Sequence, residues 1–504
     1  MATNQLKAGA ALNYIIIGLN ALVGFLYTPY MLHKLGQSEY GLYSLVASVV
    51  AYLTLMDFGF GNAVVRYTAK YRAEGKDEKQ YQLFGMLFLL YVGISILCTM
   101  GGLVLYFNVD SLFGDTMTQI ELERAKVMML ILTFNLAFTF IFHIFGSIIT
   151  AYEDFVFQKT IGIIRLILNT LIMVFLLHLG YKAIAMVVVT TVFNVVTLLI
   201  NYVYCKRKIK IKIRFGHFDK ALMREIAIYS FWIFLNAIMD RIYWSTGQFV
   251  LGAVSGTIAV SVFALAIHME SMYMSFSTAI SGVFLPRVTG MVATNKSERE
   301  ISNLFIKTGR IQFIVLAFIF SGFLVFGVPF IRLWAGDEYA DSYYISLMFF
   351  AALIIPLIQN MGITILQARN QMKFRSLLYI CIASVSLVAQ VFLSRIWGAM
   401  GCAVAISLAL LIGQGLIMNI YYQKCQGIDI ARFWKEIGKM SVAPIVLTTV
   451  AVVVVSTFDI HSWGVLLLSI GVFALCYIPM FWKFSMSAYE RELIAQPFRL
   501  QKRR

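Results

Sequence analysis

Apolar residues fall into runs of about 20 positions, separated by short polar gaps. A helix needs about 20 apolar residues to cross the hydrocarbon core of a bilayer. The pattern therefore predicts an all-α integral membrane protein with about 14 transmembrane helices. The predicted spans cover residues 10–31, 42–62, 83–107, 127–150, 160–179, 183–204, 226–251, 257–286, 311–334, 343–367, 376–394, 400–422, 441–458 and 463–482.

Lys and Arg residues are distributed unevenly over the gaps. If the N-terminus lies in the cytoplasm, alternation of the spans puts 34 of the 41 Lys and Arg residues inside and five outside, with Arg241 and Arg332 within helices. Cytoplasmic loops carry an excess of these residues, and one missed span would invert every later loop. The ratio thus favours this count and places both termini in the cytoplasm. The first run is longer than the apolar core of a signal peptide and lacks a cleavage site after it, so we expect a transmembrane helix there.

Composition excludes several classes of protein. The chain is 60% apolar and 13% charged, against about 45–50% and about 25% in soluble domains. Its net charge of +16 resides in short gaps rather than in a patch on a soluble domain, so we expect no nucleic-acid partner. There is no phosphate-binding loop of the form GxxxxGK[ST], and no outside gap offers room for a catalytic domain. We therefore do not expect an enzyme, and a polytopic glycosyltransferase or polymerase is the least favoured alternative.

A weak internal repeat appears when the sequence is shifted by 220 residues. Tyr40–Leu45 then falls on Val260–Leu265, and Gly36 falls on Gly256. A parallel repeat of this kind is typical of transporters built from two six-helix lobes related by a pseudo-twofold axis along the membrane normal. The predicted organisation is an N-terminal lobe (1–204), a basic cytoplasmic linker (205–225), a C-terminal lobe (226–422), two extra helices (423–482) and a basic cytoplasmic tail (483–504).

Six segments of the chain carry a resemblance to known proteins: residues 29–43, 57–61, 65–67, 240–242, 260–266 and 285–287. They resemble one family of membrane proteins, the bacterial polysaccharide transporters. These are the Wzx-type oligosaccharide or O-antigen flippases of the multidrug/oligosaccharidyl-lipid/polysaccharide exporter superfamily. One departure is Ser261, where the family usually has Gly.

The resemblance implies both a mechanism and a substrate. It implies two lobes around a central cavity that opens alternately to each side of the bacterial inner (cytoplasmic) membrane. The substrate would be an oligosaccharide on polyprenyl diphosphate, flipped to the outer leaflet for a surface polysaccharide such as O-antigen or capsule. Membrane lipids and polysaccharide polymerase or export proteins are the other expected partners. The alternative is a cation-coupled drug or small-molecule antiporter of the same superfamily, although antiporters usually have twelve helices, and the extra pair at 441–482 favours the polysaccharide branch.

Intramembrane charges are the first candidates for a site, because each is costly and usually faces a cavity. Asp240 and Arg241 lie near the middle of the seventh predicted helix. Arg241 is the candidate for the diphosphate, since a guanidinium holds phosphate oxygens with two parallel hydrogen bonds. We expect Glu270 to be its charge partner. The competing interpretation is a buried structural ion pair without substrate contact.

Other residues have candidate roles in ion coupling and in sugar contact. Asp57, Asp240, Glu270 and His268 could bind H⁺ or Na⁺, although a core histidine satisfied by its neighbours is the commoner case for His268. No metal and no other cofactor is expected. Further substrate contacts are predicted at the cytoplasmic mouths of the two lobes, where simple anchoring at the membrane interface is an equal alternative. Aromatic rings could also stack on sugars, although most aromatics in such a chain face lipid. These residues are Arg66 and Arg287 at the mouths, and Tyr243, Trp244 and Tyr273 among the aromatics.

Overall fold

The fold is helical. A computed structural model describes residues 2–216, 219–281, 288, 291, 296–369 and 371–492, and these residues form helices and connecting turns without a strand. This confirms the predicted all-α class. The chain packs as two compact units, residues 1–261 and 262–504, and each is considered by itself. The predicted borders of the lobes, linker and tail stay predictions.

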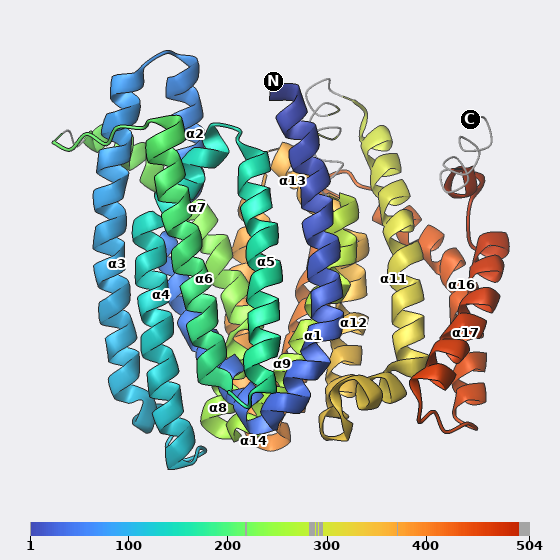
Figure 1. Ribbon diagram of the computed structural model, residues 1–504. Coiled ribbons are helices and arrows are strands. Elements are labelled where there is room, and N and C mark those ends of the chain that lie inside the picture. Colours follow the sequence, from blue (N-terminus) through green and yellow to red (C-terminus); the bar gives the residue numbers. More distant parts are fainter. Residues whose placement is uncertain are drawn as a thin grey trace. The chain divides into compact units, whose positions relative to one another are not determined.

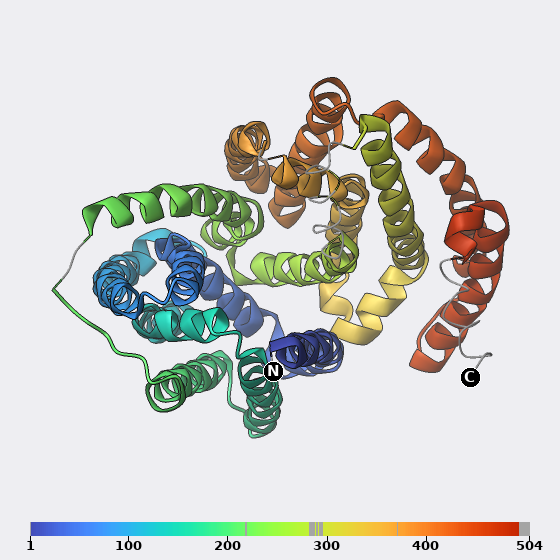
Figure 2. The ribbon, with the colours of Figure 1, turned by 90° about the horizontal axis from the view of Figure 1, so that it is seen from above.

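The first unit is a bundle of long helices (Figure 1). Helix α3 packs on α4, α4 on α6, and α1 on α5, as the two perpendicular views also show (Figures 1 and 2). Sharp helix starts have local causes: α4, for example, begins at a capping box in which Thr118 and Glu121 satisfy each other's backbone N–H groups. Its helices are α1 (Ala2–Leu53), η1 (Thr54–Asp57), α2 (Phe60–Ala73), α3 (Asp77–Phe113), α4 (Gln119–Ala151), α5 (Phe155–His178), α6 (Ala183–Tyr204), η2 (Cys205–Ile209), α7 (Lys220–Trp244), α8 (Thr246–Val254) and the start of α9 (Gly256–Ser281).

The second unit continues from α9. Helix α11 is its central element, because α12, α16 and α17 all pack against it. Figure 2 shows α11, α16 and α17 following one another along one side of this unit. The remaining helices are α11 (Glu298–Ala335), η4 (Asp337–Tyr339), α12 (Ser342–Ile358), α13 (Met361–Ala368), α14 (Lys373–Leu410), η5 (Leu411–Ile417), α15 (Met418–Cys425), α16 (Ile430–Val455) and α17 (Trp463–Phe484).

The number of spans differs from the predicted count. Among the described residues, ten helices are long and apolar enough to cross a membrane, or eleven if α12 and α13, which meet at 41°, form one span. The count of fourteen is therefore not confirmed. Two of the ten run for 59 and 53 residues, or about 88 and 80 Å, far more than the about 30 Å of hydrocarbon. Each has a non-helical glycine, Gly36 or Gly398, in the gap between two predicted spans, so each contains two of them.

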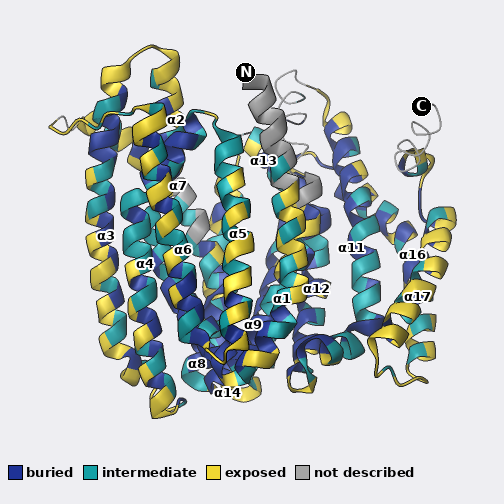
Figure 3. Cartoon of the chain, viewed as in Figure 1, coloured by how far each residue is buried: buried dark blue, intermediate teal, exposed yellow. Residues whose placement is uncertain are grey.

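Exposed residues recur along the helices (Figure 3), and many of those described are large and apolar. Phe175 on α5 is 60% exposed and Leu475 on α17 is 76% exposed. Such surfaces are stable in lipid, where the outside of a bundle has no need of polar groups. With the apolar helices, they identify a multi-pass membrane protein.

The two glycines aligned by the internal repeat have the same backbone conformation. Gly36 has φ 75° and Gly256 has φ 79°, a left-handed conformation that glycine adopts without steric cost. Each is followed by the segment that the repeat aligns, Tyr40–Leu45 or Val260–Leu265. Gly41 of the first segment also lies close to the start of α9, since a Cβ on Gly41 would be 1.9 Å from the carbonyl oxygen of Thr257.

Candidate functional site

The second predicted helix is broken near its end. Helix α1 stops at Leu53, a single 3-10 turn (η1) follows, and Phe58 and Gly59 both have positive φ, 49° and 75°, before α2 begins. A phenylalanine in this conformation is uncommon, and its ring packs against Phe234 of α7 with centroids 4.6 Å apart. A break leaves backbone groups of both helix ends without intrahelical partners. Polar side chains gather at this break.

Arg241 of α7 reaches the first residue of η1. Its Nη2 donates a hydrogen bond to Thr54 Oγ1 over 3.2 Å, and Thr54 Oγ1 in turn donates to the carbonyl oxygen of Ala51 over 2.6 Å. The next hydroxyl pair, Tyr52 and Thr246, is also hydrogen-bonded. Arg241 is half-buried, and within the described ranges it has no carboxylate partner at ion-pair distance. A pair with Glu270 would join the two units and stays a prediction.

Asp57, at the last position of η1, joins a second polar cluster. The Tyr91 hydroxyl donates to Asp57 Oδ1 over 3.1 Å and lies 3.2 Å from His143 Nδ1, which is itself 3.6 Å from Asp57 Oδ1. Tyr91 is fully buried. Gly61 lies against the histidine, because a Cβ there would be 2.5 Å from His143 Cε1. The three side chains come from η1, α3 and α4, so tertiary packing brings them together.

The cluster lies at one depth of the predicted membrane. Asp57 and His143 are five and seven residues before the ends of their predicted spans, and Tyr91 is eight residues after the start of its span. At 1.5 Å per residue, each lies about 8–12 Å from the interface predicted to be cytoplasmic. An ionisable group at such a depth is a functional candidate.

The predicted residues of α9 lie in the interior of the fold. Glu270 is 1% exposed; its Oε2 accepts a hydrogen bond from Ser271 over 3.4 Å, whereas its buried Oε1 has no hydrogen-bond partner among the described atoms. The Nε2 of His268 is likewise buried without a described partner. Tyr273 stacks on Phe350 with centroids 4.3 Å apart, so one face of its ring is covered.

The other predicted site residues are placed as follows. Asp240 is exposed, Tyr243 is buried and Trp244 is half-buried beside it, with ring centroids 6.3 Å apart. Arg66 is exposed and lies over the ring of Tyr67 at 5.6 Å. Arg287 lies outside the described residues. The structure thus brings Arg241 and Asp57 to the same turn, and the roles of all these residues stay predictions.

Sequence reasoning missed one acidic group at the opposite end of the first unit. Glu121 Oε1 accepts hydrogen bonds from Ser38 over 2.6 Å and from Thr257 over 2.9 Å, while Oε2 accepts from Thr118. One carboxylate therefore joins α1, α4 and α9. The Thr118-x-x-Glu121 spacing of a capping box was a signal for part of this arrangement, but not for the contacts with Ser38 and Thr257.

Known proteins are similar to this chain in sequence and in fold. Residues 6–292, more than half of it, match the family described as polysaccharide biosynthesis protein. A protein of Shigella flexneri whose name describes it as an O-antigen transporter is 20% identical over 406 residues, 79% of this chain and 93% of its own length.

Two solved structures illustrate the shared fold. One is the lipid II flippase MurJ in an inward closed conformation, with TM-score 0.71, 17% identity and coverage of 94% of this chain and 98% of the other. The second is an inward-facing multidrug resistance MATE family transporter of the MOP superfamily, with TM-score 0.59, 16% identity and coverage of 82% and 99%. At these identities the likeness concerns the fold alone.

Proposed function

The chain belongs to the polysaccharide biosynthesis protein family, and on that premise we propose that it flips a polyprenyl-diphosphate-linked oligosaccharide from the cytoplasmic to the outer leaflet of the bacterial inner membrane by alternating access. Relatives named as an O-antigen transporter and a lipid II flippase support a lipid-linked cargo. The protein acts in this proposal as a transporter rather than as an enzyme.

The observation that carries the proposal is that Arg241 lies beside the broken helix with a neutral hydroxyl, rather than a carboxylate, as its described partner. The cargo head group has to pass through hydrocarbon about 30 Å thick, so it needs a positive group inside the membrane. Arg241 supplies one beside a broken helix, held by the neutral hydroxyl of Thr54 at 3.2 Å. Its remaining N–H donors can bind the oxygens of a diphosphate.

The lipid tail needs an apolar path, and the second unit offers one. A pocket of about 470 Å³ lies between α11, α12 and α16, lined mainly by apolar side chains such as Phe313, Ala317 and Pro444. The tail of a membrane lipid would enter this pocket from hydrocarbon rather than from water, so it gains no hydrophobic transfer energy. The apolar lining lets an isoprenoid chain enter without burying polar groups.

The Asp57–Tyr91–His143 cluster supports coupling to protons. Histidine side chains serve as proton carriers in proteins, and a protonated His143 would pair with Asp57, 3.6 Å away. An imidazole nitrogen binds a proton through a covalent N–H bond, whereas hard metal cations such as Na⁺ prefer oxygen ligands. The test is transport into vesicles under an imposed pH gradient: His143→Gln should remove the dependence on the gradient, and an unchanged dependence would reject proton binding at this cluster.

Cation-coupled export of a small molecule is the second candidate function. The likeness to the MATE family transporter and the same polar cluster favour it. Transport by the purified chain in vesicles separates the two functions. Movement of a fluorescent polyprenyl-diphosphate oligosaccharide supports the flippase, and movement of a lipophilic cation without it supports the antiporter.

Substitutions at Arg241 test the assigned role. Arg241→Ala should leave the protein inserted and folded but stop flipping, whereas Arg241→Lys, which keeps the charge but loses the two-pronged geometry, should retain part of the activity. Arg332→Ala is the matched control, since this arginine is at the end of α11 with its side chain 55% exposed. This variant should flip the substrate at the wild-type rate.

A double substitution separates substrate binding from a structural pair. If Arg241 only pairs with Glu270, Arg241→Ala and Glu270→Gln should each destabilise the protein, and Arg241→Met with Glu270→Met should regain both stability and transport. If Arg241 binds the diphosphate, the double variant stays inactive even where it is stable. An active double variant would therefore overturn the assignment of Arg241.

A further inference from the structure

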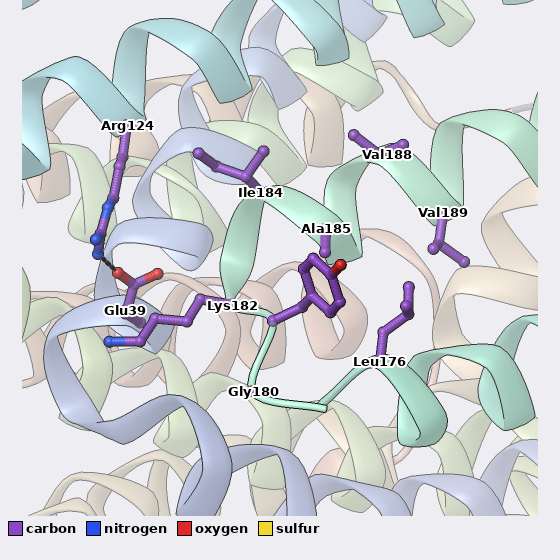
Figure 4. Close-up of a pocket in the computed structure, with 10 residues that line it drawn as sticks. Glu39, Arg124, Leu176, Gly180, Lys182, Ile184, Ala185, Val188 and Val189 are labelled. Carbon is purple, nitrogen blue, oxygen red and sulfur yellow. Dashed lines mark hydrogen bonds and ion pairs between the residues drawn. The ribbon is translucent and has the colours of Figure 1, made fainter. Parts of the chain in front are cut away.

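A groove at the α5–α6 turn has one charged and one apolar end. Its volume is about 510 Å³. Figure 4 shows Glu39, Arg124 and Lys182 on one side of it, and Leu176, Val188 and Val189 on the other. The groove therefore has the character of a site for an amphiphile.

The charged end has an excess of positive charge and hydrogen-bond donors. The carboxylate of Glu39, whose side chain is 6% exposed, forms an ion pair with Arg124 Nη1. It also accepts a hydrogen bond from the backbone N–H of Ala183 over 3.3 Å. It thereby fixes Arg124 but uses only one of the guanidinium nitrogens. Lys182 is exposed and has no partner within the described ranges. Two cations face one carboxylate, which leaves a net positive charge for an anionic ligand.

The apolar end opens onto a surface that suits lipid. On α5, only Met173 and Leu177 are buried among the described side chains, whereas Phe175 is 60% exposed. Across the groove, Val188 on α6 is 41% exposed. Apolar side chains this accessible are stable next to hydrocarbon but not next to water.

The turn itself has the composition of a membrane interface. Gly180, with φ 88°, lets the chain reverse between α5 and α6, and Tyr181 and Lys182 follow it. Tyrosine and lysine are the residues that anchor helix ends at the level of the lipid head groups. The predicted orientation puts this turn on the side opposite to the basic loops.

We propose that this groove binds an anionic phospholipid, with its phosphate at Arg124 and Lys182 and one acyl chain along Val188 and Val189. A free phosphate would leave the apolar wall unused, and a zwitterionic lipid would bring an amine against the two cations. The site is separate from the residues assigned to transport, so it goes beyond the proposed flipping of an oligosaccharide and does not depend on it.

Photo-crosslinking of the full-length chain in lipid nanodiscs tests the site. A diazirine-bearing phosphatidylglycerol probe should label residues 176–189 more strongly than the matching phosphatidylcholine probe. Lys182→Gln leaves the Glu39–Arg124 pair intact and should reduce this labelling about fivefold, the effect of one basic group on an anionic lipid. Ala185→Phe, which fills the groove, should abolish it.

Lys126→Gln is the matched control, because Lys126 is a cation of the same predicted face that pairs with Asp110 at 2.5 Å and does not line the groove. Its labelling should equal that of the wild type. Thermal unfolding of each variant checks that the bundle is intact. Equal labelling by both probes, or labelling that neither groove substitution changes in a folded protein, overturns the proposal. Displacement by a polyprenyl diphosphate but not by unlabelled phosphatidylglycerol would also overturn the assignment to phospholipid.

Discussion

A buried arginine ties the segment after α17 to α11 and α16 of the second unit. Arg310 of α11 binds Glu490 through two hydrogen bonds, Nε to Oε1 over 2.5 Å and Nη2 to Oε2 over 2.9 Å, and binds Glu436 of α16 over 2.8 Å. The Arg310 and Glu490 side chains are only 9% and 2% exposed. Replacement of either partner should therefore affect the stability of this unit strongly.

The loss of stability depends on which charged group each substitution leaves buried without a partner. Loss of one partner of a buried pair costs about 3–5 kcal/mol. Glu490→Gln should fall at the low end, about 3 kcal/mol, because Arg310 keeps Glu436 as a partner. Arg310→Met should fall at the high end, about 5 kcal/mol, since it leaves the Glu490 carboxylate buried without a cation. Arg310→Met combined with Glu490→Leu should recover most of the loss, because no buried charge remains.

Thermal unfolding in detergent, followed by intrinsic fluorescence, measures these changes. A loss of about 3 kcal/mol corresponds to a drop in Tm of roughly 6–12 °C for a unit of this size. Lys439→Gln is the control, since Lys439 lies 3.8 Å from Glu436 with its side chain 66% exposed and such pairs contribute little. Single variants that unfold at the wild-type temperature, or a double variant that loses as much as both singles together, would refute the reasoning.

The same pair predicts how stability depends on pH. Burial acts to raise the pKa of Glu490, but hydrogen bonds from Arg310 and Ser487 and the charge of Arg310 outweigh it and lower the pKa below its ordinary value. A depressed pKa in the folded state means that the carboxylate stabilises the fold above its unfolded pKa. This stabilisation is lost as the pH falls through the folded pKa. The wild type should therefore lose more of its Tm on acidification than Glu490→Gln does.

Three further predictions concern the first unit and the orientation of the chain. Glu121→Gln removes the charge from the hydrogen bonds that join α1, α4 and α9, so hydrogen exchange near Thr257 should become faster, and unchanged exchange would contradict a role in holding these ends together. Gly41→Ala puts a methyl group 1.9 Å from the Thr257 carbonyl oxygen, so it should lower the yield of folded protein sharply, in contrast to a similar substitution at Gly18, which has open space around it. Lys212→Cys should resist an impermeant thiol reagent in intact cells and Asp337→Cys should react, whereas the opposite result would reverse the predicted orientation.

The hydrophobic pattern predicted the helices because the bilayer sets their length. Runs near 20 residues became helices, and the glycines between close runs became kinks, as at Gly36 and Gly398. The pattern did not predict the break at Thr54–Gly59, because the predicted span 42–62 covers these residues as one continuous helix. Phe58, with its positive φ, packs its ring against Phe234, far away in the sequence, and no local signal encodes that contact.

Residues of the candidate site were predicted only where their type is rare in an apolar run. Arg241 and Asp57 attract attention because charges are rare in apolar runs. Tyr91 does not, since tyrosine is common in membrane helices, and its role depends on Asp57 and His143 meeting it from two other elements. Glu490 was part of a predicted basic tail, and its burial depends on Arg310, 180 positions earlier. Sequence alone cannot show such long-range pairings.

The two groups proposed to bind substrate and proton are attached to the same short turn. Arg241 holds Thr54 at the start of η1, and Tyr91 and His143 hold Asp57 at its end. A turn with a break on its C-terminal side can rotate without disrupting a continuous helical ladder, so a new ion pair between His143 and Asp57 can shift the hydroxyl that positions Arg241. Coupling between two ligands is reciprocal: if binding of a proton at this cluster changes the affinity for the diphosphate, then the diphosphate must change the affinity of the cluster for the proton by the same factor. For the proposed proton-coupled flippase, this turn is thus the element of the first unit through which the two ligands would be coupled.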